Sequence, residues 1–333
     1  MAERQTGGGT GAVGGVRPLM PLWLAVVVAF VCGGLMALQS RVNGELGSRL
    51  GDGFAASVLS FGSGLVIVTV ILVLMPSGRR GLRRIAPAVR EGRLPVWPLF
   101  GGLSGAFFVL TQSIASVAIG ISVFTIAFVG GLTASGLVVD RLGLGPGGRR
   151  LITTRRALGA ALAVAAVVWS VSAHIRVDIP VWLLLLPLIA GFLNAIQQGG
   201  NGRLGAAVGS GVTSTFVNFV MGTAGLVIAL VIHAAVAGTG LPSSYPSDWW
   251  LYIGGVLGVA FIFGLATAVR VTGVLILGLC TVAGQLTGAL VLDLALPGVA
   301  PLDWTTPAAI LVVVLGVAIA TVPVRRRAVR TPR

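Results

Sequence analysis

One stretch of this chain occurs twice, and the duplication limits the possible folds more than any other feature. Residues 33–64 and 191–222 share 12 identical residues in 32 gapless positions, including the pattern Q-x3-N-G-x-L-G. Unrelated sequences match at about one position in twenty, or rather more in a glycine-rich chain, so an internal repeat is the natural explanation. Whatever one copy folds into, the other is expected to fold into as well.

The repeat continues beyond this stretch at a slightly different shift. At 153 positions Trp97 coincides with Trp250 and Asp140 with Asp293. The shift changes between 65 and 96, where a polar linker is expected to absorb the difference in length. The predicted organisation is a disordered tail at 1–19, a first repeat at 20–174, a linker at 175–179, a second repeat at 180–324 and a basic tail at 325–333.

The composition excludes a water-soluble fold. Hydrophobic residues make up 56% of the chain and charged residues 10%, and the mean hydropathy is +1.00, whereas soluble domains are about 25% charged. Apolar runs of about 20 residues, the length that crosses a bilayer as a helix, recur along the chain. We therefore predict an all-α integral membrane protein of ten spans, at 20–40, 54–75, 97–117, 120–139, 157–174, 181–198, 212–236, 249–269, 273–292 and 306–324.

The arginines predict how the helices cross the membrane. The net charge is +14 and every basic residue is arginine. Short arginine-rich loops stay on the cytoplasmic side, and with both termini placed there 20 arginines lie inside while only Arg41, Arg49 and Arg176 lie outside. This distribution accounts for the positive charge without a nucleic-acid partner. It also predicts an inner (plasma) membrane protein with cytoplasmic N- and C-termini.

Five helices per copy is an odd number, so the second copy is expected to enter the membrane upside down. Its segments 237–248 and 293–305, which correspond to arginine-rich loops of the first copy, contain no arginine. Inverted repeats related by an axis in the membrane plane are typical of secondary transporters. The sequence therefore predicts a transporter that works by alternating access.

The chain also resembles a known family. The Q-x3-N-G-x-L-G pattern, the Gly-Gly pair that opens the third predicted span and the run from Gly284 and Gln285 to Asp293 are similar to the YdcZ-like family of the drug/metabolite transporter (DMT) superfamily. The resemblance covers nearly the whole chain apart from the tails. It implies a ten-helix transporter with a central site and leaves the substrate open. The first copy departs from the pattern at Leu132, where the second has Gln285.

Side-chain amides inside apolar runs are the candidate substrate ligands. Polar groups at membrane depth are costly unless they face a cavity or a partner helix, so these amides either line a solute path or hold helices together. Asn43 and Asn201 lie near predicted helix ends, where helix capping is a third explanation. The nine candidates are Gln39, Asn43, Gln112, Asn194, Gln197, Gln198, Asn201, Asn218 and Gln285.

The acidic residues are candidates for gating or for coupling to an ion. All nine lie in tails, loops or at predicted helix ends, and only Glu45, Asp140 and Asp293 come close enough to the membrane interior to be considered. Asp140 and Asp293 are equivalent in the repeat, yet the inverted topology places them on opposite sides. That favours a boundary or gating role over a shared ion site.

Other classes of function find less support in the sequence. No phosphate-binding, zinc or nucleophile–base motif occurs within the apolar runs, so we expect no catalytic residue, no metal site, no cofactor and no enzyme activity. The expected partners are a small-molecule substrate and the lipid bilayer, and a homodimer is left open. The first hypothesis is a secondary transporter of small polar, neutral or zwitterionic metabolites or drug-like molecules. The alternative is a non-transporting membrane scaffold or lipid-handling protein.

Overall fold

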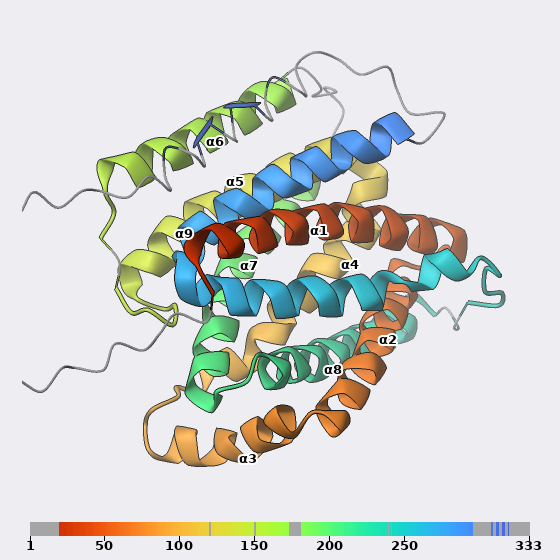
Figure 1. Ribbon diagram of the computed structural model, residues 1–333. Coiled ribbons are helices and arrows are strands. Elements are labelled where there is room, and N and C mark those ends of the chain that lie inside the picture. Colours follow the sequence, from red (N-terminus) through yellow and green to blue (C-terminus); the bar gives the residue numbers. More distant parts are fainter. Residues whose placement is uncertain are drawn as a thin grey trace, which may run out of the picture.

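The computed structural model describes residues 20–119, 121–149, 151–172, 181–238, 240 and 242–295, together with isolated helical positions between 308 and 319. Every regular element in these residues is a helix (Figure 1). The helices are α1 (Leu22–Leu50), α2 (Gly53–Leu74), α3 (Pro76–Arg90), α4 (Gly101–Ile119), α5 (Ile121–Leu142), α6 (Thr154–Ser172), α7 (Val181–Val208), α8 (Gly211–Ala237) and α9 (Gly254–Ala295), with short 3-10 turns η1 (Trp97–Phe100) and η2 (Trp249–Tyr252).

The membrane character expected from the composition is confirmed. Five segments of the described chain are long and apolar enough to cross a bilayer: Leu22–Leu50, Gly53–Leu74, Trp97–Ala115, Gly211–Ala237 and Trp249–Leu292. Helices α5, α6 and α7 also overlie predicted spans. The predicted span at 306–324 and the two tails lie almost wholly outside the described residues. The total of ten spans and the side on which the termini lie stay predictions.

The same two-residue turn follows the long helix that carries the Q-x3-N-G-x-L-G pattern in each half. Gly51 and Gly209 follow α1 and α7 in the left-handed conformation, with φ of 64° and 72°, which glycine adopts without a steric penalty. The next residue then caps the following helix: Asp52 accepts from the backbone of Phe54 and Ala55, and Ser210 accepts from Thr213. The turn therefore directs α2 and α8 back across the membrane.

The structure corrects one expectation about this region and excludes one of the open explanations. α1 has 29 residues, more than the roughly 20 that cross the hydrocarbon core, and it continues to Leu50 through the segment expected to be a loop. Asn43 and Asn201 consequently lie inside α1 and α7, one to two turns before their ends, so neither asparagine caps a helix.

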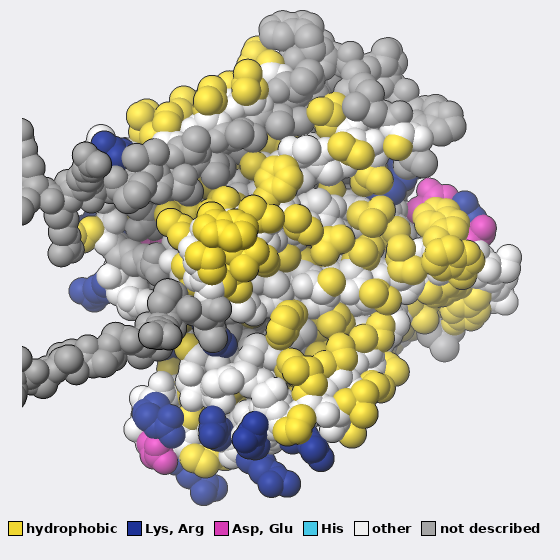
Figure 2. Space-filling view, viewed as in Figure 1, with side chains coloured by type: hydrophobic (Ala, Val, Ile, Leu, Met, Phe, Trp, Pro, Cys, Tyr) yellow, Lys and Arg dark blue, Asp and Glu magenta, His cyan; other side chains and the backbone are white. Residues whose placement is uncertain are grey.

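The region between 65 and 96, where a polar linker is expected, is also mostly helical. α3 begins at Pro76, a residue that is favoured in the first turn of a helix because its missing N–H needs no partner there. One face packs on the start of α8, where Thr213 donates a hydrogen bond of 3.0 Å to the Gly78 carbonyl. The opposite face carries exposed arginines, seen as a row along the edge of the molecule in Figure 2.

Close contacts between helices occur in pairs, and the two contacts of a pair are equivalent in the repeat. A side chain at Gly102 in α4 would collide with the Asn218 carbonyl in α8, and one at Gly255 in α9 would collide with the Ser60 carbonyl in α2. These four residues are repeat partners. The same holds for Gly33 against Thr281 and Gly191 against Phe128. Each half therefore supplies the helix that the other half needs, which is what an approximate twofold relation requires.

One contact joins residues that are equivalent to each other. The rings of Phe61 and Phe219 lie 5.1 Å apart between centroids, and both side chains are buried. Residues that are exchanged by a twofold rotation and touch each other lie beside its axis. This aromatic pair therefore lies beside the approximate twofold axis that relates the two halves.

Candidate functional site

Five of the predicted amides form one continuous chain of hydrogen bonds. They come from α7, whose Asn194, Gln197, Gln198 and Asn201 share one side because they are three or four residues apart, and from Asn218 in α8. Gln198 donates to Asn194 at 2.8 Å, Asn194 to Gln197 at 3.1 Å, Gln197 to Asn218 at 3.1 Å, and Asn218 to Asn201 at 3.0 Å. All five side chains are buried. We call this set the second-half amide chain.

The first half contains a smaller set built on α1. Gln39 donates a 2.7 Å hydrogen bond to the carbonyl of Gly254, the first residue of α9. Asn43 donates at 3.5 Å to Gln112 of α4, which in turn donates to the hydroxyl of Ser40. All four side chains are buried. We call Gln39, Ser40, Asn43 and Gln112 the first-half cluster.

The Phe61–Phe219 pair lies between the two sets. A Cβ at Gly105 would stand 2.6 Å from Gln197 Nε2 and 3.3 Å from the Phe61 ring. Its repeat partner, Gly258, is 2.9 Å from Gln39 Nε2 and 3.2 Å from the Phe219 ring by the same measure. Each glutamine is therefore next to one ring of the pair, so polar groups on both sides converge on an apolar centre.

Gln285 lies apart from both sets. It belongs to the second segment of α9, and its backbone nitrogen packs against Gly33 of α1. The side chain is buried, and neither its oxygen nor its nitrogen has a hydrogen-bond partner among the described residues. The structure thus joins eight of the nine predicted amides into two sets and leaves this one outside them.

Asp140 caps the helical segment that follows a break in α9. Gly273 interrupts that helix with φ of 75° and ψ of 172°. The buried carboxylate of Asp140, at the end of α5, accepts hydrogen bonds from the next two backbone amides, Val274 at 3.0 Å and Leu275 at 3.2 Å. It therefore caps the helical segment that begins there, because the first N–H groups of a helix lack internal partners. The side chain of its repeat partner, Asp293, lies outside the described residues.

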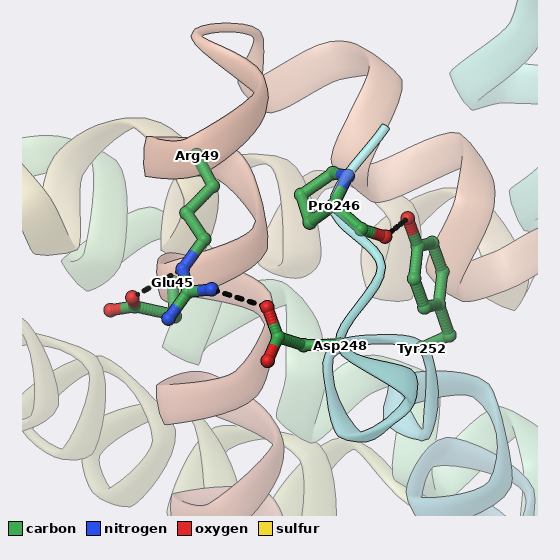
Figure 3. A network of polar contacts seen from close by, with 5 residues as sticks. All are labelled: Glu45, Arg49, Pro246, Asp248 and Tyr252. Carbon is green, nitrogen blue, oxygen red and sulfur yellow. Dashed lines mark hydrogen bonds and ion pairs between the residues drawn. The ribbon is translucent and has the colours of Figure 1, made fainter. Parts of the chain in front are cut away.

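Glu45 takes part in an exposed ion-pair network rather than in the buried sets. Figure 3 shows Arg49 of α1 between Glu45, one helical turn earlier, and Asp248, which precedes η2. Arg49 lies 2.8 Å from Glu45 and 2.6 Å from Asp248, and its guanidinium stands 5.6 Å from the centre of the Trp250 ring. The network thus links the end of α1 in the first half to the segment that opens α9 in the second.

Sequence reasoning missed the hydroxyl groups of the site. Ser40 belongs to the first-half cluster, and Ser60 is buried beside Gly254. Serine is common in membrane helices, so its presence in an apolar run gives little signal. The repeat did contain a signal for Ser60, because this serine occupies the position of the candidate amide Asn218.

Two apolar hollows among the described residues lie away from these amides. One groove of about 650 Å³ runs between α5 and α6, lined by residues such as Leu137, Ala161 and Val168. Another of about 480 Å³ lies between α2, α8 and α9, lined by residues such as Ile71 and Phe263. Their linings are almost wholly apolar, so they suit hydrocarbon chains and not a polar solute.

Comparisons with known proteins agree with this architecture. A solved structure titled "Crystal structure of protein" has a TM-score of 0.62 at 18% identity, over 92% of this chain and 98% of that one, which shows a shared fold. No curated protein matches the chain. A single family model, described as "Putative inner membrane exporter, YdcZ", matches twice, at residues 24–169 and 182–319, and so confirms the duplication. The chain is thus a multi-pass inner-membrane protein that belongs to the YdcZ family of the DMT type, with two family units fused in one polypeptide.

Proposed function

We propose that this protein is a secondary transporter that moves small polar, neutral or zwitterionic metabolites or drug-like molecules by alternating access between its inverted repeats. The observation that carries the proposal is the position of the two amide sets. They lie on opposite sides of the Phe61–Phe219 pair, in helices that the repeat exchanges. Membership of a family described as membrane exporters supports transport in general.

The proposed mechanism follows from the exchange of equivalent contacts. The two copies differ in sequence, so the two halves adopt slightly different packings. If they interchange these packings, the contacts on one side of the aromatic pair open while those on the other side close. Gln39 and Gln197, one on each side of the pair, are then the first amides that the solute meets from either direction.

The buried amides have a physical reason to bind a solute. A buried polar group without a hydrogen bond costs about 1–3 kcal/mol, so amides that separate from one another during the transition need new partners. A polar solute supplies these partners and lowers the barrier, whereas an apolar molecule cannot. This difference gives the selectivity for polar compounds.

Reconstituted protein tests the proposal. Liposomes that contain the purified protein are loaded with one unlabelled solute at a time from a broad metabolite panel. Counterflow is measured as the uptake of the same solute in labelled form. We expect one chemical class to move, and we expect Gln39→Leu and Gln197→Leu each to slow its movement at least tenfold. Thermal unfolding of both variants in detergent shows whether they remain folded.

The control is Gln285→Leu, which alters a buried amide outside both sets. Replacing this unpaired amide with a side chain of similar size is expected to preserve transport. The proposal fails if folded protein moves no solute in the panel. It also fails if the two site variants transport at the rate of the unaltered protein.

The apolar grooves favour a second candidate function, the handling of lipid. Their linings suit acyl chains, and a lipid-handling protein would need no polar path. It would exchange fluorescent phospholipids between the leaflets of proteoliposomes, and Ala161→Trp, which fills the α5–α6 groove, would slow that exchange. Transport of polar solutes that persists in Ala161→Trp rejects this alternative.

A further inference from the structure

Three oxygen atoms without hydrogen-bond partners belong to side chains that meet where α1, α2 and α9 come together. They are Gln39 Oε1, Asn43 Oδ1 and Ser60 Oγ, and none has a partner among the described residues. Their side chains are 2%, 0% and 3% exposed. A Cβ on Gly254 would stand 2.7 Å from Ser60 Oγ and collide with Asn43 Oδ1, while the Gly254 carbonyl accepts from Gln39. All three side chains therefore surround the first residue of α9.

The orientation of the Gln39 amide follows from its surroundings. A backbone carbonyl can only accept a hydrogen bond, so the group that faces the Gly254 carbonyl must be the Gln39 NH2. The Gln39 oxygen is consequently the atom that remains unpaired. A flipped amide would place two oxygens against each other.

The Asn43 amide is oriented by a short sequence of contacts. The Ser40 hydroxyl donates to the Met36 carbonyl, so it can only accept from the Gln112 NH2. Gln112 therefore turns its oxygen toward Asn43, which must offer its own NH2 in return. This leaves the Asn43 oxygen as the free atom, and both free amide atoms at this site are acceptors.

The equivalent position of the other half has no such gap. Asn218 stands where the first half has Ser60, accepts from Gln197 and donates to Asn201. The serine side chain has two fewer non-hydrogen atoms, and its hydroxyl has no partner among the described residues. The Asn43 oxygen is thus unpaired because serine stands at position 60, and the Gln39 oxygen because Met36 stands where the second half has Asn194, which donates to Gln197. In the second half the unpaired amide oxygen is a different one, Gln198 Oε1.

Resting on the transport function proposed above, we propose that these three oxygens form the subsite that recognises the substrate, and that the group it takes is an uncharged hydrogen-bond donor, such as a primary carboxamide or a hydroxyl. Acceptors without partners require N–H or O–H groups. The site lies at the first residue of α9, the positive end of the helix dipole, which disfavours a cation. The Phe219 ring of α8 packs near Gly258, one turn along α9, and offers an apolar wall to the rest of the ligand.

Matched probes test the chemistry of the ligand. Propionamide carries an N–H2 donor, N,N-dimethylpropionamide has the same oxygen without the donor, and propylammonium is a cation of similar size. Saturation-transfer NMR on the purified protein in detergent detects binding in the millimolar range. We expect a signal for propionamide and none for the other two. Equal signals from all three, propylammonium alone, or no signal from any probe would overturn the proposal.

Variants drawn from the repeat test the location. Ser60→Asn gives the first half the residue of the second, so the new NH2 pairs with the Asn43 oxygen, as Asn218 pairs with Asn201, and propionamide binding is lost. Thr69→Val, on the same helix but with a hydroxyl that bonds only the Leu65 carbonyl, is the control and keeps propionamide binding. Ser60→Ala, which is too small to disturb packing, removes one oxygen and weakens binding about tenfold. Unchanged binding in both Ser60 variants would overturn the assignment.

Transport assays separate this inference from the proposed function. If the protein moves neutral solutes in liposomes while propionamide fails to bind, the subsite is wrong and the transporter stands. If propionamide binds, no solute moves and folded Ser60→Asn loses the binding, the oxygens hold a ligand but the transport proposal fails.

Discussion

At the scale of single residues, adjacent glycines have opposite roles in helix packing. In α5 a Cβ at Gly131 would collide with the Leu188 carbonyl of α7, while one at Gly130 would make an ordinary contact of 3.7 Å with the Leu188 side chain. Backbone cannot move aside as a side chain can. Small residues at such points let membrane helices approach closely, and here they fix the distance between the two halves.

These two glycines give a matched prediction. Gly131→Ala forces α5 and α7 apart and is expected to lower stability by about 1–3 kcal/mol, the usual range for overpacking. Gly130→Ala is expected to be neutral or to stabilise the protein by up to about 1 kcal/mol, because alanine is the better helix former. Thermal unfolding in detergent compares them. Equal unfolding temperatures would show that the close contact is not required.

A second prediction concerns Asp140. Asp140→Ala leaves the N–H groups of Val274 and Leu275 without their acceptors, and each unpaired group costs about 1–3 kcal/mol. Asp140→Asn keeps one acceptor and should lose about half as much. Glu91→Ala removes only an exposed pair with Arg93 and should change stability by less than about 1 kcal/mol. If Asp140→Ala unfolds at the same temperature as Glu91→Ala, the carboxylate does not stabilise the break.

At the scale of elements, α3 is the helix that the apolar pattern does not reveal. Its inner face is short: Gly78 and Gly81 fit against the start of α8, and Ala88 packs beside Leu204 and Val208 of α7. Its outer face carries arginine, with a half-exposed Leu82 beside it. A helix of this kind lies along a membrane surface, with its basic side chains among anionic headgroups.

This arrangement predicts a dependence on anionic lipid. Each arginine near an anionic surface contributes about 1 kcal/mol of attraction. Phosphatidylglycerol should therefore raise the unfolding temperature of the protein in mixed micelles, and the combined variant R79Q/R80Q/R83Q/R84Q should lose most of the increase. Arg93→Gln, which alters an arginine already paired with Glu91, is the control. An undiminished increase in the combined variant would show that the lipid acts elsewhere.

The elements also show how much of the fold and of the candidate site can be predicted from the sequence. The helices through the apolar runs follow from hydropathy, and the repeat implies that the segments around Gly51 and Gly209 fold alike. α1 could not be followed to Leu50, because glycine and polar residues after Gln39 resemble a loop until tertiary contacts cover them. The amides stood out as polar residues in apolar runs. Their pairing, and the role of Ser60, depend on contacts between the halves that no spacing along the chain specifies.

At the scale of the whole molecule, the exchange of contacts between halves links stability to function. Each half completes the other through glycine contacts, and the aromatic pair marks the centre of the exchange. The two halves are nevertheless unequal, since Asn218 joins Gln197 to Asn201 whereas the hydroxyl of Ser60 has no partner among the described residues. A transporter with equal halves would have two equivalent conformations, whereas here the three free acceptors around Gly254 have paired equivalents in the other half.

The inverted topology is the last prediction. An odd number of spans per repeat places α3 in the cytoplasm and the segment before η2 outside the cell. Leu82 on α3 is 39% exposed, Ser243 is exposed, and the native Cys32 and Cys280 are buried, so a single introduced cysteine reports one side. A membrane-impermeant maleimide added to intact cells should label Ser243→Cys and spare Leu82→Cys, and it should label both once the membrane is opened. Labelling of Leu82→Cys but not of Ser243→Cys in intact cells would show the reverse orientation. Equal labelling of both positions would place the two segments on the same side and exclude the inversion. The mechanism of alternating access needs the two segments on opposite sides, because only halves of opposite orientation can exchange packings and thereby move the opening from one face of the membrane to the other.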